Sequence, residues 1–188
     1  MRDGNLPWFA LHVRSSRERL LETSLRNKGY ETFLPTAEVR RHWSDRIRKV
    51  QTPLFPGYLF CRFDPNHRLS ILTCPGLIQI VGRGKAPVPV DESEITAIRA
   101  VVRSKLEAGP WPHLETGDRV RIEDGPLRGL EGILLDSRSD CRLVVSVTLL
   151  QRSIAVVIER DWVMPAGRTA ISLRHLSFSA APGWLPQT

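Results

Sequence analysis

The sequence predicts two parts: an α+β sandwich over residues 7–109, in which helices pack on an antiparallel sheet, and a small all-β barrel over residues 117–164. Helix-like and strand-like patterns alternate in the first part, whereas the second contains only short β-rich runs separated by Gly, Asp, Ser and Arg. Charge divides the chain similarly. Residues 1–108 hold 18 Lys and Arg against 11 Asp and Glu, and residues 109–188 hold nine of each. The net charge of +7 therefore lies in the first part, which suggests a polyanionic partner there, although solubility alone also explains such an asymmetry.

The first part begins with a strand and a helix. Residues 8–13, WFALHV, alternate as a strand does, and residues 15–29 carry apolar side chains at helical spacing. Ser15 and Glu18 have the spacing of a capping box at the start of this helix, and Gly29 is a natural stop at its end.

Three further stretches complete the predicted sandwich. Residues 57–63 and 76–82 are typical of strands, and residues 90–109 form the clearest helix, with Gly109 and Pro110 at its end. The order of strands and helices predicts an antiparallel α+β fold of the ferredoxin-like type.

The rest of the chain is predicted to be a linker, a barrel and a tail. Residues 110–116 are the linker, which is short enough to keep the two parts close together. The β-rich runs RVRIE, GILLDS, RLVVSVTL and IAVVIE predict a small, tightly twisted barrel over residues 117–164. Residues 165–188 carry prolines and glycine without periodicity, so we expect them to be loosely ordered.

A basic hairpin is predicted in the middle of the first part. Extended patterns flank Ser44 and Asp45, which are typical of a turn. The cations and the aromatic side chain on the hairpin arms are Arg40, Arg41, Trp43, Arg46, Arg48 and Lys49. Two interpretations fit equally well. The arms contact nucleic acid, with Trp43 stacked on an unpaired base, or they form a solvated charged face with Trp43 packed inward.

The sequence disfavours several classes of protein and site. Cys61, Cys74 and Cys141 form no CxxC pair and are odd in number, so we expect buried free thiols, no metal site and no disulfide framework. No apolar stretch has the length of a membrane span and the N-terminus lacks signal-peptide features, so we expect a cytoplasmic protein without a membrane partner. Motifs of nucleotide binding, serine hydrolysis and zinc proteolysis are absent, and we expect no catalytic residue, no cofactor and no enzymatic activity.

The stretch GDRVRIEDGPLRGLEGIL, residues 117–134, opens the second part. Its glycines are Gly117, Gly125, Gly129 and Gly132. We expect them to build the turns and bulges of a small barrel rather than to bind a ligand. In its order of residues the stretch resembles a KOW motif, which occurs in transcription elongation factors and in several ribosomal proteins. The resemblance implies an SH3-like barrel.

An ordered set of segments resembles the N-terminal domain of the NusG family of transcription elongation factors. The segments are WFALHV, the helix behind it, FPGYLF, PGLIQIVG and PVPVDESEI. With the KOW stretch and RLVVSV, the resemblance covers residues 7–163. It implies a factor that binds RNA polymerase at the clamp helices of its largest subunit, suppresses pausing and acts in antitermination.

The resemblance also implies a polymerase-binding pocket. The matching residues are Phe55, Tyr58 and Phe60, with His12 on the first strand as a weaker candidate. Along a strand, Tyr58 and Phe60 point to one face while Leu59 and Cys61 point to the other. One face can therefore pack on the helices while the other meets the partner, where aromatic side chains contribute most to binding. The alternative is that all these residues belong to the core.

Further partners follow from the same resemblance. Family members place such a hairpin near upstream DNA or the non-template strand. In the housekeeping NusG pattern, a Phe in the loop after the VSV strand docks on the ribosomal protein NusE, and the terminator Rho competes for that surface. Leu150 stands at this position here. It keeps the apolar character for docking to NusE or Rho and lacks the ring.

Three functional interpretations stay open. TPLFPGYLF and RHWSDRIRKV are closer to specialised paralogs, such as RfaH or the UpxY group, than to housekeeping NusG, which predicts an operon-specific antiterminator. A housekeeping NusG that couples transcription to Rho or the ribosome is the alternative. An RNA-binding or translation protein built on the KOW barrel is disfavoured by the zero net charge of the second part.

Overall fold

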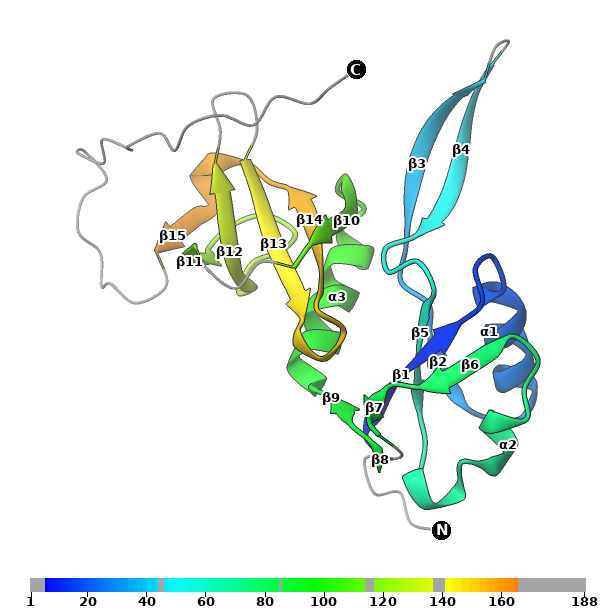
Figure 1. The fold of residues 1–188 in the computed structure, drawn as a ribbon. Coiled ribbons are helices and arrows are strands. Elements are labelled where there is room, and N and C mark those ends of the chain that lie inside the picture. The colour runs from blue at the N-terminus through cyan, green and yellow to red at the C-terminus, as the bar shows by residue number, and fades with distance from the viewer. Residues whose placement is uncertain (1–5, 44–45, 85, 114–116, 137–140, 166–188) are drawn as a thin grey trace.

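A computed structural model describes residues 6–43, 46–84, 86–113, 117–136 and 141–165 of the chain. It shows a mixed α/β protein in which antiparallel sheets carry few helices (Figure 1). A five-stranded sheet forms the first half, a six-stranded sheet forms the second, and a long two-stranded hairpin projects from the first half. Among the described residues, no helix combines the length and the apolar character that a membrane span requires.

The first sheet confirms the strands predicted around residues 8–13, 57–63 and 76–82. Its strands are β1 (Trp8–Val13), β2 (Glu31–Phe33), β5 (Tyr58–Arg62), β6 (Leu77–Ile80) and β9 (Pro89–Val90). Their order is β2-β5-β1-β6, with β9 also paired to β1, and the pairs are antiparallel. The helices of this half are α1 (Glu18–Asn27), α2 (Leu69–Leu72) and α3 (Glu92–Ser104), and a 3-10 turn, η1 (Pro65–His67), precedes α2.

One face of the first sheet is covered by α1 and α2. Alternate residues of β1 and β5, among them Phe9, Leu11, Leu59 and Cys61, point to this face and are buried there. Leu21 on α1 belongs to the same apolar cluster. Because burying a side chain of this size contributes about 1.5–3 kcal/mol, this cluster is a main source of the stability of the first half.

The opposite face of the first sheet is covered by α3. Trp8, Ala10 and Phe60 point to this face and are buried in one cluster with Ile95 and Ile98 of α3. The predicted division of β5 into two faces is therefore confirmed.

Helix α1 begins two residues later than the capping-box pattern predicts. Ser16 adopts a positive φ of 62° and Arg17 occupies the N-cap position. Glu18 does not close a capping box, because its carboxylate accepts a hydrogen bond from the backbone N–H of Gly57 at 2.9 Å. The C-terminal end agrees with the prediction, since Gly29 follows the helix with a φ of 85°.

Helix α3 ends at Ser104, before the predicted stop at Gly109. The Ser104 hydroxyl donates to the carbonyl of Val101 at 2.7 Å and accepts from the N–H of Leu106 at 3.2 Å. Lys105 takes a left-handed conformation with a φ of 57°. The serine therefore caps the last turn, and the chain leaves the helix four residues before the glycine.

The predicted basic hairpin is present. Strands β3 (Thr36–Trp43) and β4 (Arg46–Pro53) pair along their whole length in antiparallel register. Figure 1 shows that the hairpin extends well beyond the sheet and the helices of the first half. A second, much shorter hairpin consists of β7 (Gly82–Arg83) and β8 (Ala86–Pro87).

The second half is a six-stranded antiparallel sheet. Its strands are β10 (Ala108–Pro112), β11 (Asp118–Ile122), β12 (Glu131–Asp136), β13 (Cys141–Val147), β14 (Arg152–Val157) and β15 (Val163–Pro165). Their order is β10-β14-β13-β12-β11-β15, and the 3-10 turns are η2 (Thr148–Leu150) and η3 (Arg160–Trp162). The four β-rich runs of the sequence are confirmed as strands. The predicted tail lies outside the described residues from residue 166 onward.

The predicted linker at residues 110–116 needs correction at its start. Residues 110–112 belong to β10, which pairs with β14 from Ala108 opposite Val156 to Pro112 opposite Arg152. Prolines are tolerated there because β10 stands at one end of the strand order, where a strand need not donate on both sides. Residues 114–116 lie outside the described residues.

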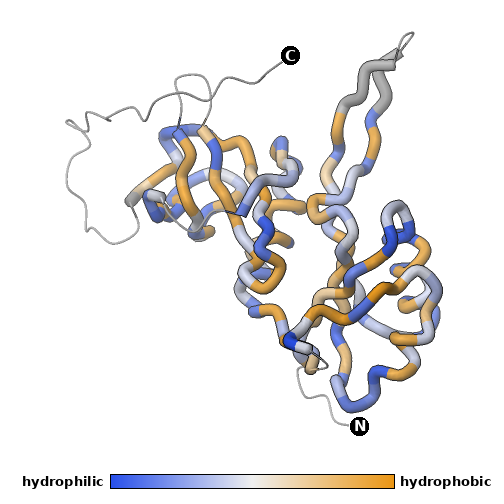
Figure 2. Tube along the Cα trace, viewed as in Figure 1, coloured by the Kyte–Doolittle hydropathy of each residue, from blue (hydrophilic) through white to orange (hydrophobic). Residues whose placement is uncertain are grey.

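The two halves share one apolar cluster. Leu143 and Val145 of β13 are buried in the cluster that contains Ile95 and Ile98 of α3. Figure 2 shows apolar residues along α3 and along the strands of the second sheet beside it. Helix α3 is therefore packed between the two sheets.

Candidate interaction site

Four sequence-predicted residues meet on the α3 side of the first sheet, and we call them the aromatic surface: His12, Phe55, Tyr58 and Phe60. His12 lies opposite Tyr58 in the β1–β5 register, and their rings stack with centroids 5.2 Å apart and planes 22° apart. The Phe55 ring meets Phe60 edge to face at 5.9 Å and 87°. The fold therefore brings all four residues together.

The exposure of the aromatic surface is uneven. Phe55 is 2% exposed and Phe60 is fully buried, whereas His12 and Tyr58 are half-buried. The expectation that Phe55 and Phe60 form an open surface is wrong for this conformation. The physical reason is that α3 and the second sheet supply apolar side chains that cover this face within the chain. Contact of these residues with a polymerase stays a prediction.

The turn before β5 is held by Glu18, which the sequence pattern predicted to close a capping box instead. Gly57 has a φ of 81°, its N–H donates to buried Glu18, and its carbonyl accepts from the N–H of Val13 at 2.8 Å. The N–H of Tyr58 donates to the carbonyl of Phe55 at 3.0 Å and closes the turn. A residue with a Cβ is strained at this φ, so the glycine is required by geometry. These bonds set where Phe55 and Tyr58 lie.

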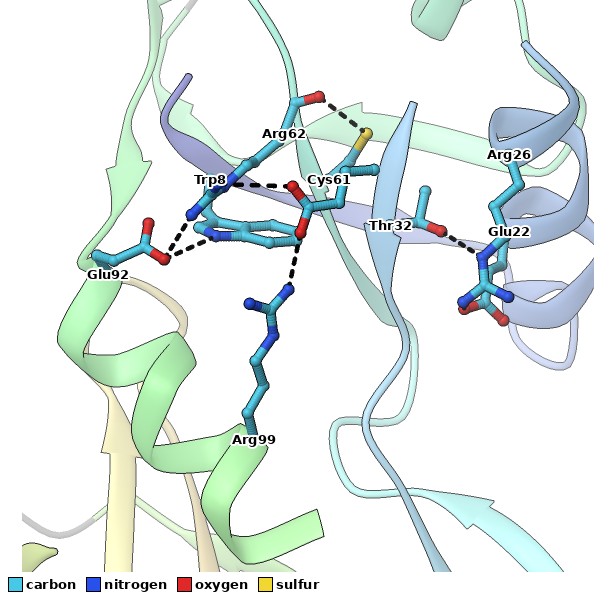
Figure 3. Close-up of polar contacts among 9 residues, drawn as sticks. Trp8, Glu22, Arg26, Thr32, Cys61, Arg62, Glu92 and Arg99 are labelled. Carbon is cyan, nitrogen blue, oxygen red and sulfur yellow. Dashed lines mark hydrogen bonds and ion pairs between the residues drawn. The ribbon is translucent and has the colours of Figure 1, made fainter. Parts of the chain in front are cut away.

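A polar cluster around Trp8 ties α3 to the first sheet (Figure 3). The Trp8 ring lies between two guanidinium groups, those of Arg62 on β5 at 4.9 Å and Arg99 on α3 at 4.8 Å. Glu92 on α3 accepts from the Trp8 Nε1–H at 3.4 Å and from Arg62 at 2.5 Å. Glu31 pairs with Arg99 at 3.0 Å and with Arg62 at 3.5 Å. Sequence reasoning missed this cluster, because its members are far apart in the chain: Trp8 and Glu92 alone are 84 positions apart, and Arg99 is farther still.

A hollow of about 590 Å³ lies between the halves, beside the aromatic surface. It is lined by residues of the 54–58, 110–113 and 150–153 segments, which include Phe55 and Tyr58 on one side and Leu150 on the other. Leu150 is 8% exposed. The candidate polymerase-binding residues and the candidate residue for NusE or Rho therefore border the same space.

A backbone contact next to Leu150 joins the halves directly. The N–H of Thr148, the first residue of η2, donates to the carboxylate of Glu94 on α3 at 3.0 Å. The free N–H at the start of this turn thus gains a charged acceptor from the other half, which strengthens the hydrogen bond.

The backbone register of the hairpin fixes which positions on its two arms face each other. Arg40 pairs with Lys49, Arg41 with Arg48, and Trp43 with Arg46. The Lys49 ammonium lies 2.7 Å from the carboxylate of Glu38, and both side chains are exposed. The predicted contact residues whose side chains lie outside the described part are Arg40, Arg41, Trp43, Arg46 and Arg48. The register nevertheless brings these cationic positions together along both arms.

Three of the four glycines of the KOW-like stretch, Gly117, Gly125 and Gly132, sit at tight places in the second half. Positive φ values occur at Gly117, Gly125 and Gly129. A Cβ on Gly125 would lie 2.7 Å from the Trp162 ring, and a Cβ on Gly132 would lie 2.6 Å from the carbonyl oxygen of Val144. At Gly125 and Gly132, therefore, the packing of the sheet itself leaves no room for a side chain.

The cysteines and the other metal-ligating side chains of the described residues are scattered rather than grouped. No group of three His, Cys, Asp or Glu in the described part of the chain is arranged to hold a metal ion. Cys61, Cys74 and Cys141 carry thiols rather than disulfides, and all three are buried. Burial raises the pKa of the Cys61 thiol to about 12, so this group is protonated at neutral pH.

Known protein families give one match over the first half. The family described as "Transcription termination factor nusG" matches residues 6–99, which are 94 of the 188 residues and thus half of the chain.

Individual relatives extend the similarity into the second half. The Transcription termination/antitermination protein NusG of Thermus thermophilus is 28% identical over 184 residues, covering 86% of this chain and all of the relative. The protein of the same name from Pseudomonas aeruginosa is 27% identical and covers 81% of this chain and 94% of the relative. A solved structure described as "Domain interaction in Thermotoga maritima NusG" has a TM-score of 0.53 at 20% identity and covers 85% of this chain and 97% of that chain. This last likeness concerns the fold.

Proposed function

The chain belongs to the NusG family of transcription factors, and from this premise we propose that it binds RNA polymerase through the aromatic surface, at the clamp helices of the largest subunit. Bound there, it suppresses pausing and acts in antitermination. The observation that carries the proposal is that four residues matched to the family's pocket by sequence, His12, Phe55, Tyr58 and Phe60, are brought together by the fold.

The chemistry of the aromatic surface suits a helical partner. Apolar helix faces dock into grooves through a few large side chains, and aromatic residues at the centre contribute most of the affinity. His12 and Tyr58 are half-buried and stacked, so little side-chain entropy is lost when a partner covers them. Phe55 and Phe60 pack beside them. Phe60 lies two residues after Tyr58 on the same face of β5, and Phe55 contacts Phe60 edge to face.

Polymerase binding in this proposal requires the second half to move. The hollow beside the aromatic surface is closed on its far side by Leu150 and by β10. The present conformation therefore corresponds to a closed form, in which the same contact covers the polymerase-binding residues and the NusE- or Rho-docking position. Leu150 is then available to NusE or Rho only after the halves separate.

The test is a binding measurement in which the two half-buried residues of the aromatic surface are changed. Because Tyr and His at the centre of an interface contribute about 2 kcal/mol or more together, we expect His12→Ala with Tyr58→Ala to weaken polymerase binding about thirtyfold. A matched control, Leu20→Ala with Ile78→Ala, removes two exposed apolar side chains elsewhere in the first half and should leave the affinity unchanged. Unchanged binding by the folded His12/Tyr58 variant would overturn the site.

The basic hairpin and the branch of the family complete the proposal. The hairpin contacts upstream DNA or the non-template strand, which is supported by its projection from the first half and by the cationic positions along its register.

The chain acts as an operon-specific paralog rather than as the housekeeping factor, and the Leu at position 150 supports this choice. Transcript profiling after gene deletion should show changes confined to a few operons, and a genome-wide effect would favour the housekeeping alternative.

A further inference from the structure

Strand β10 connects the two halves and leaves very little free chain between them. Helix α3 ends at Ser104 and β10 begins at Ala108, so three residues, 105–107, separate them. Even Glu107 is engaged, because its carbonyl accepts from the N–H of Val157 at 2.9 Å. Three extended residues span about 10 Å. While β10 is paired with β14, the second sheet therefore stays within about that distance of the end of α3.

The strand also takes part in covering the aromatic surface. Pro110, Trp111 and Pro112 line the hollow opposite Phe55 and Tyr58. A partner that enters the hollow must displace these residues, whatever becomes of the rest of the second sheet. Freeing the aromatic surface therefore requires β10 to move.

The composition of β10 makes its pairing weak. Its five residues include Pro110 and Pro112, which have no N–H to donate, and Gly109, which loses much conformational freedom in a strand. The strand stands at one end of the strand order and pairs with β14. Its main anchor is Trp111, which packs against the cluster of Ile133, Val144 and Ala155. Ala108 at the start of the strand is also buried, so Trp111 is the one large apolar side chain of a strand that has few donors of its own.

Release of β10 changes the length of the connection. The tether grows from residues 105–107 to at least residues 105–112, that is, from three residues to eight. Eight extended residues span about 27 Å, compared with about 10 Å before release. The longer tether lets the second sheet leave the hollow while the Trp8 cluster keeps α3 on the first sheet.

We propose that β10 is a releasable strap: paired with β14 it holds the second sheet over the aromatic surface, and released it becomes the tether that lets RNA polymerase bind. The proposal rests on the proposed function of the aromatic surface. It adds that opening proceeds by unpairing of one strand, at a place where the sequence has the features of a linker.

A reversible cross-link between the strap and β14 tests the proposal. Gly109 lies directly opposite Ala155, and a Cβ on Gly109 meets nothing within 4 Å. Facing residues of antiparallel strands have Cα separations of about 4.5–5.5 Å, which suit a disulfide. Gly109→Cys with Ala155→Cys should therefore form a disulfide on oxidation. The native cysteines are buried, and each single variant serves as a control for mispairing.

The expected result is a loss of polymerase binding that reduction reverses. The oxidised double variant should bind RNA polymerase at least tenfold more weakly than the wild type, and the reduced double variant should bind as the wild type does. Equal binding by the oxidised and reduced forms would overturn the strap. Absence of binding by the wild type would instead overturn the proposed function, and the strap with it, so the two failures are distinguishable.

A second variant tests the strap in the other direction. Trp111→Ala removes the anchor and should release β10, so the apparent affinity for polymerase should rise severalfold. Trp162→Ala, which removes an aromatic side chain packed on Gly125 elsewhere in the second half, is the matched control and should not raise the affinity. An unchanged or lower affinity of the Trp111 variant, with the second sheet still folded, would contradict the proposal.

Discussion

Glu18 is the residue that fixes the turn in front of the aromatic surface. It is buried, and its carboxylate accepts the N–H of Gly57, whose positive φ leads into Tyr58. We predict that Glu18→Ala lowers the free energy of unfolding by about 1–3 kcal/mol, because a buried donor loses its charged acceptor. Glu18→Gln keeps an acceptor oxygen and should lose less. Urea unfolding of the two variants checks this, and equal stability of Glu18→Ala and wild type would contradict it.

Ionisation of the Cys61 thiol makes the stability of the first half depend on pH in the alkaline range. Burial raises the pKa of its thiol from the ordinary value of 9.0 to about 12. A group with a raised folded pKa contributes stability that is fully present below the unfolded pKa and is lost as pH rises toward the folded pKa. We therefore predict that the wild type loses more stability between about pH 9 and pH 12 than Cys61→Ala does. Parallel losses in chemical unfolding across this range would contradict the assignment.

Sequence and structure differ at single residues where a long-range bond competes with a local one. The pattern at Ser15 and Glu18 is that of a capping box, but the Gly57 N–H takes the carboxylate. Local spacing contains no information about a partner 39 positions away. The alternation of Tyr58 and Phe60 against Leu59 and Cys61 was predictable, because the period of two is a property of the strand itself.

The nucleic-acid contact that we propose for the hairpin depends on the positive charge of its arms. Its arms carry Arg40, Arg41, Arg46 and Arg48, and the register places Arg40 and Arg41 opposite Lys49 and Arg48. If they contact phosphates, changing all four arginines to Gln should reduce the slope of log affinity for DNA against log salt by about 0.9 for each lost contact. Arg103→Gln, an exposed change on α3, is the control and should leave the slope unaltered. An unchanged slope in the quadruple variant would assign the hairpin to a solvated face.

Two element boundaries differ from those that the sequence patterns predict, and each difference has a physical cause. Helix α3 was predicted to reach Gly109, but the Ser104 hydroxyl caps the helix first. Residues 110–112 were predicted to belong to a linker, but they form a strand because β14 offers an edge and Trp111 offers apolar contact. Both corrections depend on tertiary partners, whereas the strongly patterned strands β1, β5, β13 and β14 needed none to be predicted.

For the molecule as a whole, the regulation that we propose depends on how the two halves pack against each other. Sequence patterns predicted two parts but not that they share an apolar cluster across α3. Helical periodicity predicted the helix over residues 90–109 without saying which sheet would cover its apolar face. The result is a closed form in which Tyr58 and Leu150 border one hollow. If Tyr58 contacts polymerase and Leu150 docks a second partner, as we propose, the two binding events are thermodynamically linked, because a single contact covers both residues.

The most direct test of the central claim is a site-specific cross-link from the aromatic surface to polymerase. A photoreactive phenylalanine derivative replaces Tyr58 in the full chain, and transcription elongation complexes are irradiated. We predict a cross-link to the clamp helices of the largest subunit. The same derivative in place of Ile78, which is 52% exposed on β6, should give none at that position. Cross-linking of the Tyr58 derivative to other sites alone, in complexes that contain the protein, would contradict the claim.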